Sequence, residues 1–198
     1  MRVISGAFGG RKLKTTSGSG YRPATDRVRE ALFSMLETRG IDWEHSRVLD
    51  VFAGSGSLGI EALSRGAKVV WFLERNRRAC GLIAANLKTF GVASDRTSIL
   101  SRDVFAILKS PPQAPFDLAF VDPPYGKDML EPALNLLLDR GWLSPSGFVA
   151  AEIEAGLTMD PAARNGLDLL VDRTYGQTRI CVWTTSSASP STPGPLIP

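Results

Sequence analysis

Apolar positions in the first part of the chain follow the spacing of one helix face. In the segment RPATDRVREALFSMLETRG, apolar side chains recur every three or four residues, at Val28, Ala31, Leu32, Met35 and Leu36. This spacing is typical of an amphipathic helix with one buried face. Thr25 or Asp26 can cap its amino end and Gly40 can stop it, so we expect a helix between these residues.

From residue 47 onward, short apolar runs alternate with stretches of helical spacing. The runs predict strands at 47–52, 68–74, 97–101, 117–122, 147–154, 169–175 and 179–184. Helices are expected between the first five strands, for instance at 57–65, which Gly66 ends, and at 77–90, which Asn76 caps and Gly91 ends. Alternation of this kind predicts a parallel sheet that helices cover on both faces.

The last two predicted strands depart from this alternation. Only residues 176–178 separate them, and so short a connection is typical of a hairpin. One strand of the sheet should therefore run antiparallel to the others. The fold class that we expect is α/β, with a doubly wound, mostly parallel seven-stranded sheet and one antiparallel strand.

The two ends of the chain differ from this body. The strand-like runs 2–5 and 11–16 flank a glycine-rich turn, which predicts a small basic β-hairpin or arm over residues 1–20. After Thr185 the segment SSASPSTPGPLIP has low complexity, so residues 186–198 are expected to form a disordered tail. Residues 21–185 then make one domain, because a chain of 198 residues with 43% hydrophobic content can support one sizeable core.

Charge is unevenly distributed along the chain. The net charge is +3, yet residues 1–40 hold eight basic and three acidic side chains. A basic arm on a slightly acidic body fits a protein that binds nucleic acid, because Lys and Arg displace counterions from phosphates. A solvated terminus would have the same composition. The arm residues that we expect to contact phosphates are Arg2, Arg11, Lys12 and Lys14.

Composition also indicates a compartment. No apolar run reaches the length of a membrane span, and the N-terminus lacks the zones of a secretion signal. The two cysteines, Cys80 and Cys181, have no C-x-x-C spacing and are expected to be reduced thiols of the core. We therefore expect a cytoplasmic protein with no membrane contact and no metal site.

A glycine-rich turn lies between the first predicted sheet strand and the helix that follows it. In LDVFAGSGSLGIEAL, Gly54, Gly56 and Gly59 have the spacing G-x-G-x-x-G, which brings a ligand close to the backbone and packs the helix on the strand. Glu74 lies twenty residues beyond Gly54, at the end of the second strand, where a carboxylate can bind both hydroxyls of a ribose. These features fit any cofactor that contains adenosine.

The acid before the turn narrows the choice of cofactor. Asp50 lies at the end of the first strand, where its charge would repel a pyrophosphate but favour the ammonium and sulfonium of S-adenosylmethionine (SAM). Asp103 follows the third strand and can accept a hydrogen bond from the adenine amino group, with Val104 or Phe105 against the ring. A helix N-cap is an equally good interpretation of Asp103.

A second motif, FVDPPYG, follows the fourth strand. Its two prolines stop the strand and hold Asp122 in an extended conformation. The Asp122 carboxylate and the Pro123 carbonyl can accept hydrogen bonds from an exocyclic amine of a base, and Tyr125 can stack on that base. In a doubly wound sheet the fourth strand lies beside the first, so this loop should face the glycine turn. Whether Asp122 also takes the proton stays open, and a proline-stiffened turn is the structural alternative.

Two combinations of motifs resemble known families. DVFAGSG followed by DPPY resembles the amino-methyltransferase branch of the class I, Rossmann-like SAM-dependent enzymes. RPATDRVREALF together with GGRKL resembles the bacterial RsmD family, which methylates the 2-amino group of one guanine in 16S ribosomal RNA. The resemblance extends over residues 2–184. It implies SAM as cofactor, and 16S rRNA in a partly assembled small subunit as substrate, with ribosomal proteins as partners of a monomeric enzyme.

The resemblance also implies roles for individual residues. Asp50, Ala53, Gly54 and Gly56 would hold the methionine part of SAM, Glu74 the ribose, Asp103 and Val104 the adenine, and Asp122, Pro123 and Tyr125 the target amine and base. Arg22 and Arg29, with Thr25 and Asp26, match the N-terminal signature of the family, which implies closure over the cofactor or contact with RNA.

Other functions share parts of this pattern. The nearest are SAM-dependent methyltransferases that act on adenine in DNA or RNA, or on a protein glutamine, although the glutamine enzymes usually have Asn where this chain has Asp122. A non-catalytic RNA-binding assembly factor would not need Asp50 and Asp122. A nicotinamide dehydrogenase would be expected to lack Asp50 and the Pro-Pro-Tyr loop.

Overall fold

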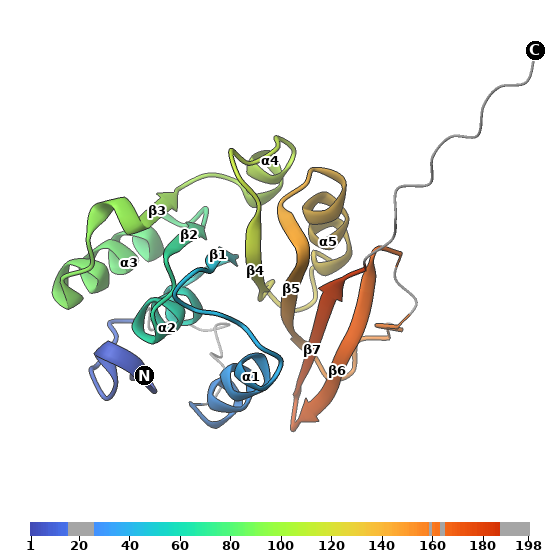
Figure 1. Cartoon of the computed structure of the whole chain (residues 1–198), viewed down its shortest axis with the longest axis horizontal. Coiled ribbons are helices and arrows are strands. Elements are labelled where there is room, and N and C mark those ends of the chain that lie inside the picture. The colour runs from blue at the N-terminus through green and yellow to red at the C-terminus, as the bar shows by residue number, and fades with distance from the viewer. Residues whose placement is uncertain (16–25, 159, 163–164, 187–198) are drawn as a thin grey trace, which may run out of the picture.

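The molecule is built on one seven-stranded sheet (Figure 1). The computed structural model describes residues 1–15, 26–158, 160–162 and 165–186. The order of the strands is β3-β2-β1-β4-β5-β7-β6, and β7 alone runs antiparallel to the other six strands. The strands are β1 Arg47–Val51, β2 Val69–Leu73, β3 Thr97–Leu100, β4 Phe116–Val121, β5 Leu143–Glu154, β6 Leu167–Tyr175 and β7 Thr178–Thr185. The α/β class and the single antiparallel strand are thereby confirmed.

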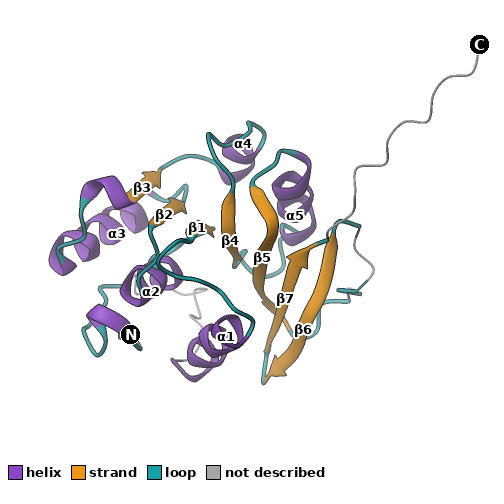
Figure 2. Cartoon of the chain, viewed as in Figure 1, coloured by secondary structure: helices purple, strands orange, loops and turns teal. Residues whose placement is uncertain are grey.

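Helices cover the sheet on both faces (Figure 2). They are α1 Asp26–Thr38, α2 Ser57–Arg65, α3 Arg77–Phe90, α4 Val104–Leu108 and α5 Leu130–Asp139. Buried side chains form two clusters, one between the sheet and α1, α2 and α3, the other between the sheet and α4 and α5. Within the described residues, no helix is long and apolar enough to cross a membrane.

The order of the sheet reverses between β1 and β4. These strands are parallel neighbours with Val51 opposite Val121, so the loops that follow them leave the same edge of the sheet side by side. In doubly wound folds this reversal is where ligands bind. The topology therefore places the glycine turn after β1 next to the Asp-Pro-Pro-Tyr loop after β4, as expected.

Strand β5 begins earlier than the apolar pattern predicts. It starts at Leu143 rather than at residue 147, and its first residues include Pro145 and Ser146, which has a φ of 61°. The pairing with β4 shifts register after the Phe116–Leu143 pair, so this part of the strand is irregular. Proline and residues with a left-handed backbone usually mark turns, so the pattern of apolar residues does not predict this part of the strand.

The N-terminal segment is a short, irregular hairpin that docks on α2, with Val3 N donating to Arg11 O at 3.0 Å and Leu13 N to Met1 O at 3.2 Å. Within residues 1–15, the predicted strands reduce to one antiparallel bridge between Arg2 and Lys12, around a short 3₁₀ turn. The backbone N–H groups of Ile4 and Ser5 donate instead to the carboxylate of Glu61 on α2, at 2.7 and 3.0 Å. Because these donors bond to α2, they do not extend the hairpin ladder. The remainder of the predicted arm, and the predicted tail from residue 187 onward, lie outside the described residues.

We expect Glu61→Gln to loosen this docked segment. Glu61 is fully buried and also binds Arg65 Nε at 3.0 Å, so a neutral amide would lose the ion pair and one of two acceptors for backbone N–H groups. The free energy of unfolding should fall by about 1–3 kcal/mol, the range for a lost hydrogen bond to a charged group. Urea unfolding measures the loss, and cleavage after Arg2 or Arg11 by trypsin reports the loosening. Glu30→Gln, on the exposed side of α1, is the control; equal stability and cleavage in both variants would contradict the expectation.

Candidate active site

The glycine turn after β1 has the backbone that its sequence requires. Gly54 and Gly56 have φ angles of 54° and 74°, in the left-handed region that favours glycine. Gly59 serves packing, because a Cβ atom there would lie 2.4 Å from Cε1 of Phe72 on β2. The turn thus combines an unusual backbone with close approach of α2 to the sheet, as the spacing of the three glycines predicts.

Two predicted cofactor carboxylates are held by backbone groups of this turn. Asp50 is buried, and its Oδ2 accepts a hydrogen bond of 2.9 Å from the N–H of Gly59. Glu74 accepts from Gly54 N at 2.8 Å and from Asn76 N at 2.7 Å, one with each oxygen. These bonds fix the orientation of both carboxylates, and each oxygen keeps a further lone pair for a ligand. Burial raises the pKa of Asp50 well above its ordinary value.

The turn also contains features that fit a bound cofactor. Ser55 is buried, and its hydroxyl has no hydrogen-bond partner among the described residues. Phe52 has a φ of 62°, which is costly for a bulky side chain and typical of functional loops. Its ring meets Phe105 edge to face at 6.0 Å, beside the loop where adenine is expected. An unpaired hydroxyl and an aromatic wall are appropriate for an adenosine-containing ligand.

Asp103 caps a helix, which is one of the two roles that the sequence allows for it. Its Oδ1 accepts a hydrogen bond of 3.0 Å from Ala106 N, so it is the N-cap of α4. The cap uses one oxygen of an exposed carboxylate, and contact with adenine stays a prediction. Val104, the first residue of α4, is buried below it.

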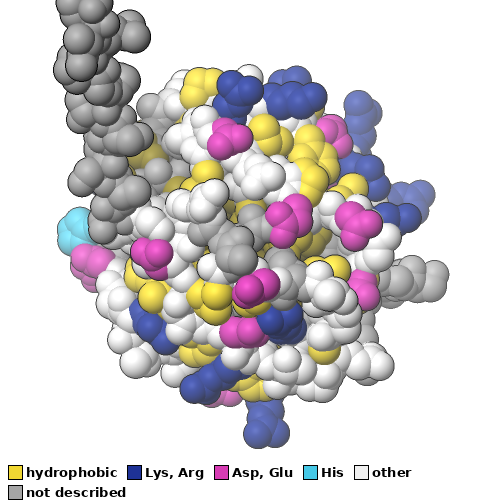
Figure 3. Space-filling model, turned by 90° about the vertical axis from the view of Figure 1, so that its right-hand side faces the viewer, with side chains coloured by type: hydrophobic (Ala, Val, Ile, Leu, Met, Phe, Trp, Pro, Cys, Tyr) yellow, Lys and Arg dark blue, Asp and Glu magenta, His cyan; other side chains and the backbone are white. Residues whose placement is uncertain are grey.

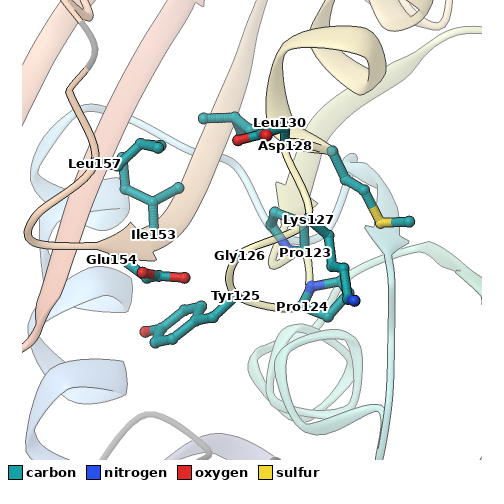
Figure 4. Close-up of a pocket in the computed structure, with 11 residues that line it drawn as sticks. Pro123, Pro124, Tyr125, Gly126, Lys127, Asp128, Leu130, Ile153, Glu154 and Leu157 are labelled. Carbon is teal, nitrogen blue, oxygen red and sulfur yellow. The ribbon is translucent and has the colours of Figure 1, made fainter.

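The Asp-Pro-Pro-Tyr loop leaves β4 beside the end of β1. Asp122 N donates to Val51 O across these two strands at 3.4 Å. The Tyr125 ring is 42% exposed, and its hydroxyl lies 3.4 Å from Oγ1 of Thr178 on β7. A pocket lies between residues 123–130 and the end of β5, with Ile153, Glu154 and Leu157 on its opposite wall (Figure 4). An exposed aromatic ring next to an open pocket is suited to stacking on a base.

A further acid, which neither sequence motif contains, lies at this edge of the sheet. Glu152 on β5 is 5% exposed, and it follows Ala151, the partner of Val121 on β4. Burial raises the pKa of Asp122 to about 7 and that of Glu152 to about 8, where the charge of Asp122 raises it further and that of Arg29 lowers it. An acid inside the buried run FVAAEIE was the available signal, but no motif contains it.

The residues predicted to contact RNA lie in different surroundings. Arg29 is 1% exposed and donates from Nη2 to Arg2 O and to Asp26 Oδ1, both at 2.7 Å. Direct contact of Arg29 with RNA is therefore contradicted, because its side chain is buried, whereas a part in closure over the cofactor stays a prediction. Arg11 is exposed and lies over the ring of Phe90 at 4.4 Å. Lys12 and Lys14 are exposed, whereas Arg22 lies outside the described residues.

Surface charge is mixed rather than continuous. In Figure 3, Lys and Arg side chains lie along the upper and right-hand margins of one face and also across its lower part, with acidic side chains between them. Within the described residues, no group of three or more His, Cys, Asp or Glu side chains is placed to hold a metal ion.

Comparison with known proteins agrees with the motifs. The family described as Conserved hypothetical protein 95 matches residues 1–184. Ribosomal RNA small subunit methyltransferase D of Haemophilus influenzae is 40% identical over 156 residues, 78% of this chain and 79% of that protein. The putative rRNA methyltransferase YlbH of Bacillus subtilis is 37% identical over 186 residues, 92% of this chain and 98% of that protein.

Solved structures of similar proteins also indicate a methyltransferase family. The putative methyltransferase yhhF from Escherichia coli superposes with a TM-score of 0.81 at 32% identity, covering 95% of this chain and 99% of that one. A putative methylase from Haemophilus influenzae superposes with a TM-score of 0.78 at 34% identity, covering 93% and 97%. The chain therefore belongs to the family described as Conserved hypothetical protein 95, the RsmD family of methyltransferases.

Proposed function

We propose that this protein transfers a methyl group from SAM to the 2-amino group of one guanine in 16S rRNA. The observation that carries the proposal is the meeting of the glycine turn and the Asp-Pro-Pro-Tyr loop at the reversal between β1 and β4. Membership of the RsmD family supports the choice of rRNA, because relatives are named as ribosomal RNA small subunit methyltransferases. The cofactor and the acceptor would then enter from neighbouring loops at one sheet edge.

The residues present fit SAM. The methionine end would lie at the turn of Ala53, Gly54 and Gly56 above Asp50, the ribose at Glu74, and adenine between Asp103, Val104 and the Phe52–Phe105 pair. When bound, SAM supplies an electrophilic methyl group on a positively charged sulfur. The buried Asp50 and the half-buried Glu74 favour that positive charge, and SAM carries no pyrophosphate that they would repel.

The loop after β4 would prepare the acceptor amine. The lone pair of this nitrogen is delocalised into the purine ring, so the amine is a poor nucleophile until its hydrogens are held. The Asp122 carboxylate and the Pro123 carbonyl would accept those hydrogens, and Tyr125 would stack on the base. A pKa of about 7 allows the Asp122 carboxylate to take up the proton that the amine loses. The rate enhancement would come mainly from positioning and from exclusion of water.

The basic N-terminal residues would hold the RNA near this site. Guanine N2 is paired within a duplex, so the enzyme must act on an unpaired nucleotide or extrude it. Arg2, Arg11, Lys12 and Lys14 are the proposed phosphate contacts. We further propose a partly assembled small subunit as substrate, ribosomal proteins as partners, a cytoplasmic location and a monomeric enzyme.

Methyl transfer to ribosomal particles tests the function. Small subunits from a strain that lacks the endogenous enzyme would be incubated with the protein and radiolabelled SAM, and the RNA digested to nucleosides. Label should appear in N2-methylguanosine at one position. Label in adenosine or in protein would refute the guanine assignment, and deproteinised 16S rRNA as a parallel substrate tests the need for an assembled particle.

Thermal melting with different cofactors should identify the one that this protein binds. A ligand at 100 times its Kd stabilises the folded state by about 2.7 kcal/mol, which shifts the melting temperature of a domain of this size by about 5–10 °C. SAM and S-adenosylhomocysteine should both raise the melting temperature, whereas NAD should not. Stabilisation by NAD alone would contradict the SAM assignment.

A further inference from the structure

Three carboxylates lie on one face of the sheet at the ends of neighbouring strands. Side chains alternate between faces along a strand. Phe120 on β4 and Ala150 on β5 point into the cluster under α1, so Asp122 and Glu152, each two residues further on, point to the same face. Asp50 on β1 is the third member. Glu152 and Asp122 therefore stand side by side, because Val121 and Ala151 before them are strand partners.

The Glu152 carboxylate differs from that of Asp50 in accepting no hydrogen bond from the described residues. Asp50 accepts from Gly59 N, but no donor bonds to Glu152 within the described residues, although this side chain is only 5% exposed. A carboxylate that is largely removed from water and accepts no hydrogen bond from the protein can accept one from a bound ligand. Its position next to Asp122 is where the edge of the acceptor base would lie.

The surroundings of Glu152 act on its pKa in opposite directions, since burial and the charge of Asp122 raise it and the charge of Arg29 lowers it. Arg29 on α1 is 1% exposed, its Nε and Nη1 have no partner in the described part of the chain, and its charge favours ionised Glu152. Tyr125 lies close enough for the charge of Glu152 to raise the pKa of its hydroxyl. Glu152 therefore lies next to the half-buried Asp122 and a buried guanidinium, with the exposed Tyr125 nearby, so incoming N–H donors would find two acceptors at the ends of adjacent strands.

Guanine presents the donors that such a pair requires. Its N1–H and its 2-amino group point in nearly the same direction, whereas N1 of adenine carries a lone pair that a carboxylate repels. We infer that Glu152 accepts the N1–H of the target guanine while Asp122 accepts a hydrogen of its amine, so that Glu152 determines the preference for guanine. This inference rests on the proposed function and extends it to a specificity residue outside the Asp-Pro-Pro-Tyr motif.

The test compares two acceptor bases in wild-type protein and in Glu152→Gln. Small-subunit RNA would carry either guanine or 2-aminopurine at the methylated position; 2-aminopurine keeps the amine but has a lone pair at N1. Wild-type protein should prefer guanine in kcat/KM by about 10- to 100-fold, as expected for one hydrogen bond to a charged group. The glutamine amide can donate to the lone pair, so Glu152→Gln should reduce this ratio to within a few-fold of one.

Controls separate the inference from the proposed function. Glu30→Gln on the exposed side of α1 should keep the wild-type ratio, and melting of each variant with S-adenosylhomocysteine shows that it is folded and binds the cofactor. A wild-type ratio in folded Glu152→Gln would overturn the role of Glu152 while leaving guanine methylation intact. Absence of any guanine methylation by wild-type protein would instead overturn the proposed function.

Discussion

Asp122→Ala is expected to lower the rate of methyl transfer by about 100- to 1,000-fold, the range for loss of a preorganised polar group at a reacting centre. The carboxylate lies at the reversal of the sheet, beside the end of β1, and is the side chain best placed to hold the amine and take its proton. Alanine removes both the acceptor and the base. SAM binding should change little, since the cofactor residues belong to β1, β2 and the loop after β3.

Single-turnover transfer with radiolabelled SAM measures the rate, and calorimetric titration with S-adenosylhomocysteine measures cofactor binding. Asp95→Ala, an exposed acid before β3 at the opposite end of the strands, is the matched control and should keep both. Equal loss of transfer and of cofactor binding in Asp122→Ala would show that the carboxylate is structural. Asp122→Asn should recover part of the rate if its amide oxygen still positions the amine.

Much of the fold followed from local signals in the sequence. The helices α2 and α3 occupy the predicted residues 57–65 and 77–90 because their ends carry strong local determinants. The Asn76 side chain accepts from Arg78 N and Ala79 N, and Gly66 and Gly91 adopt left-handed φ angles at the other ends. The two loop motifs were equally clear, since glycines and prolines act on the backbone wherever they occur.

The features that the sequence did not reveal depend on contacts between distant segments. Arg29 was expected to contact RNA or close over the cofactor from its match to the family signature, but α1 packs over β4, with the Phe33 and Phe120 rings 5.4 Å apart, and Arg29 on this helix is 1% exposed. Ile4 and Ser5 bond to Glu61, more than fifty residues away, instead of continuing a hairpin. The positive φ of Phe52 has no local sequence signal. Long-range packing decided each case.

The pH dependence of activity and of stability should have opposite signs. Asp122 and Glu152 have pKa values raised to about 7 and about 8, so both become better acceptors as pH rises through this range. The rate of transfer should increase at least about tenfold between pH 6 and pH 8, as for one required group that ionises near 7. The other ionisable groups that act on the pair are Arg29, whose charge lowers the pKa of Glu152, and Asp50, whose own pKa burial raises well above its ordinary value.

The free energy of unfolding should change with pH in the opposite direction to the rate. A carboxyl whose pKa is higher in the folded than in the unfolded state binds its proton more tightly when folded, so its contribution is complete below about pH 4 and is lost as pH rises through the folded value. The free energy of unfolding should therefore fall by a few kcal/mol between pH 5.5 and pH 8.5. Asp42 and Asp172, whose pKa values are lowered, stay ionised throughout this window and add no slope. Urea unfolding at several pH values measures the slope, and Glu152→Gln should make it shallower because one of the carboxyls with a raised pKa no longer titrates. If the free energy of unfolding of the wild-type protein rose with pH, Asp122 and Glu152 would not be buried carboxyls with raised pKa values.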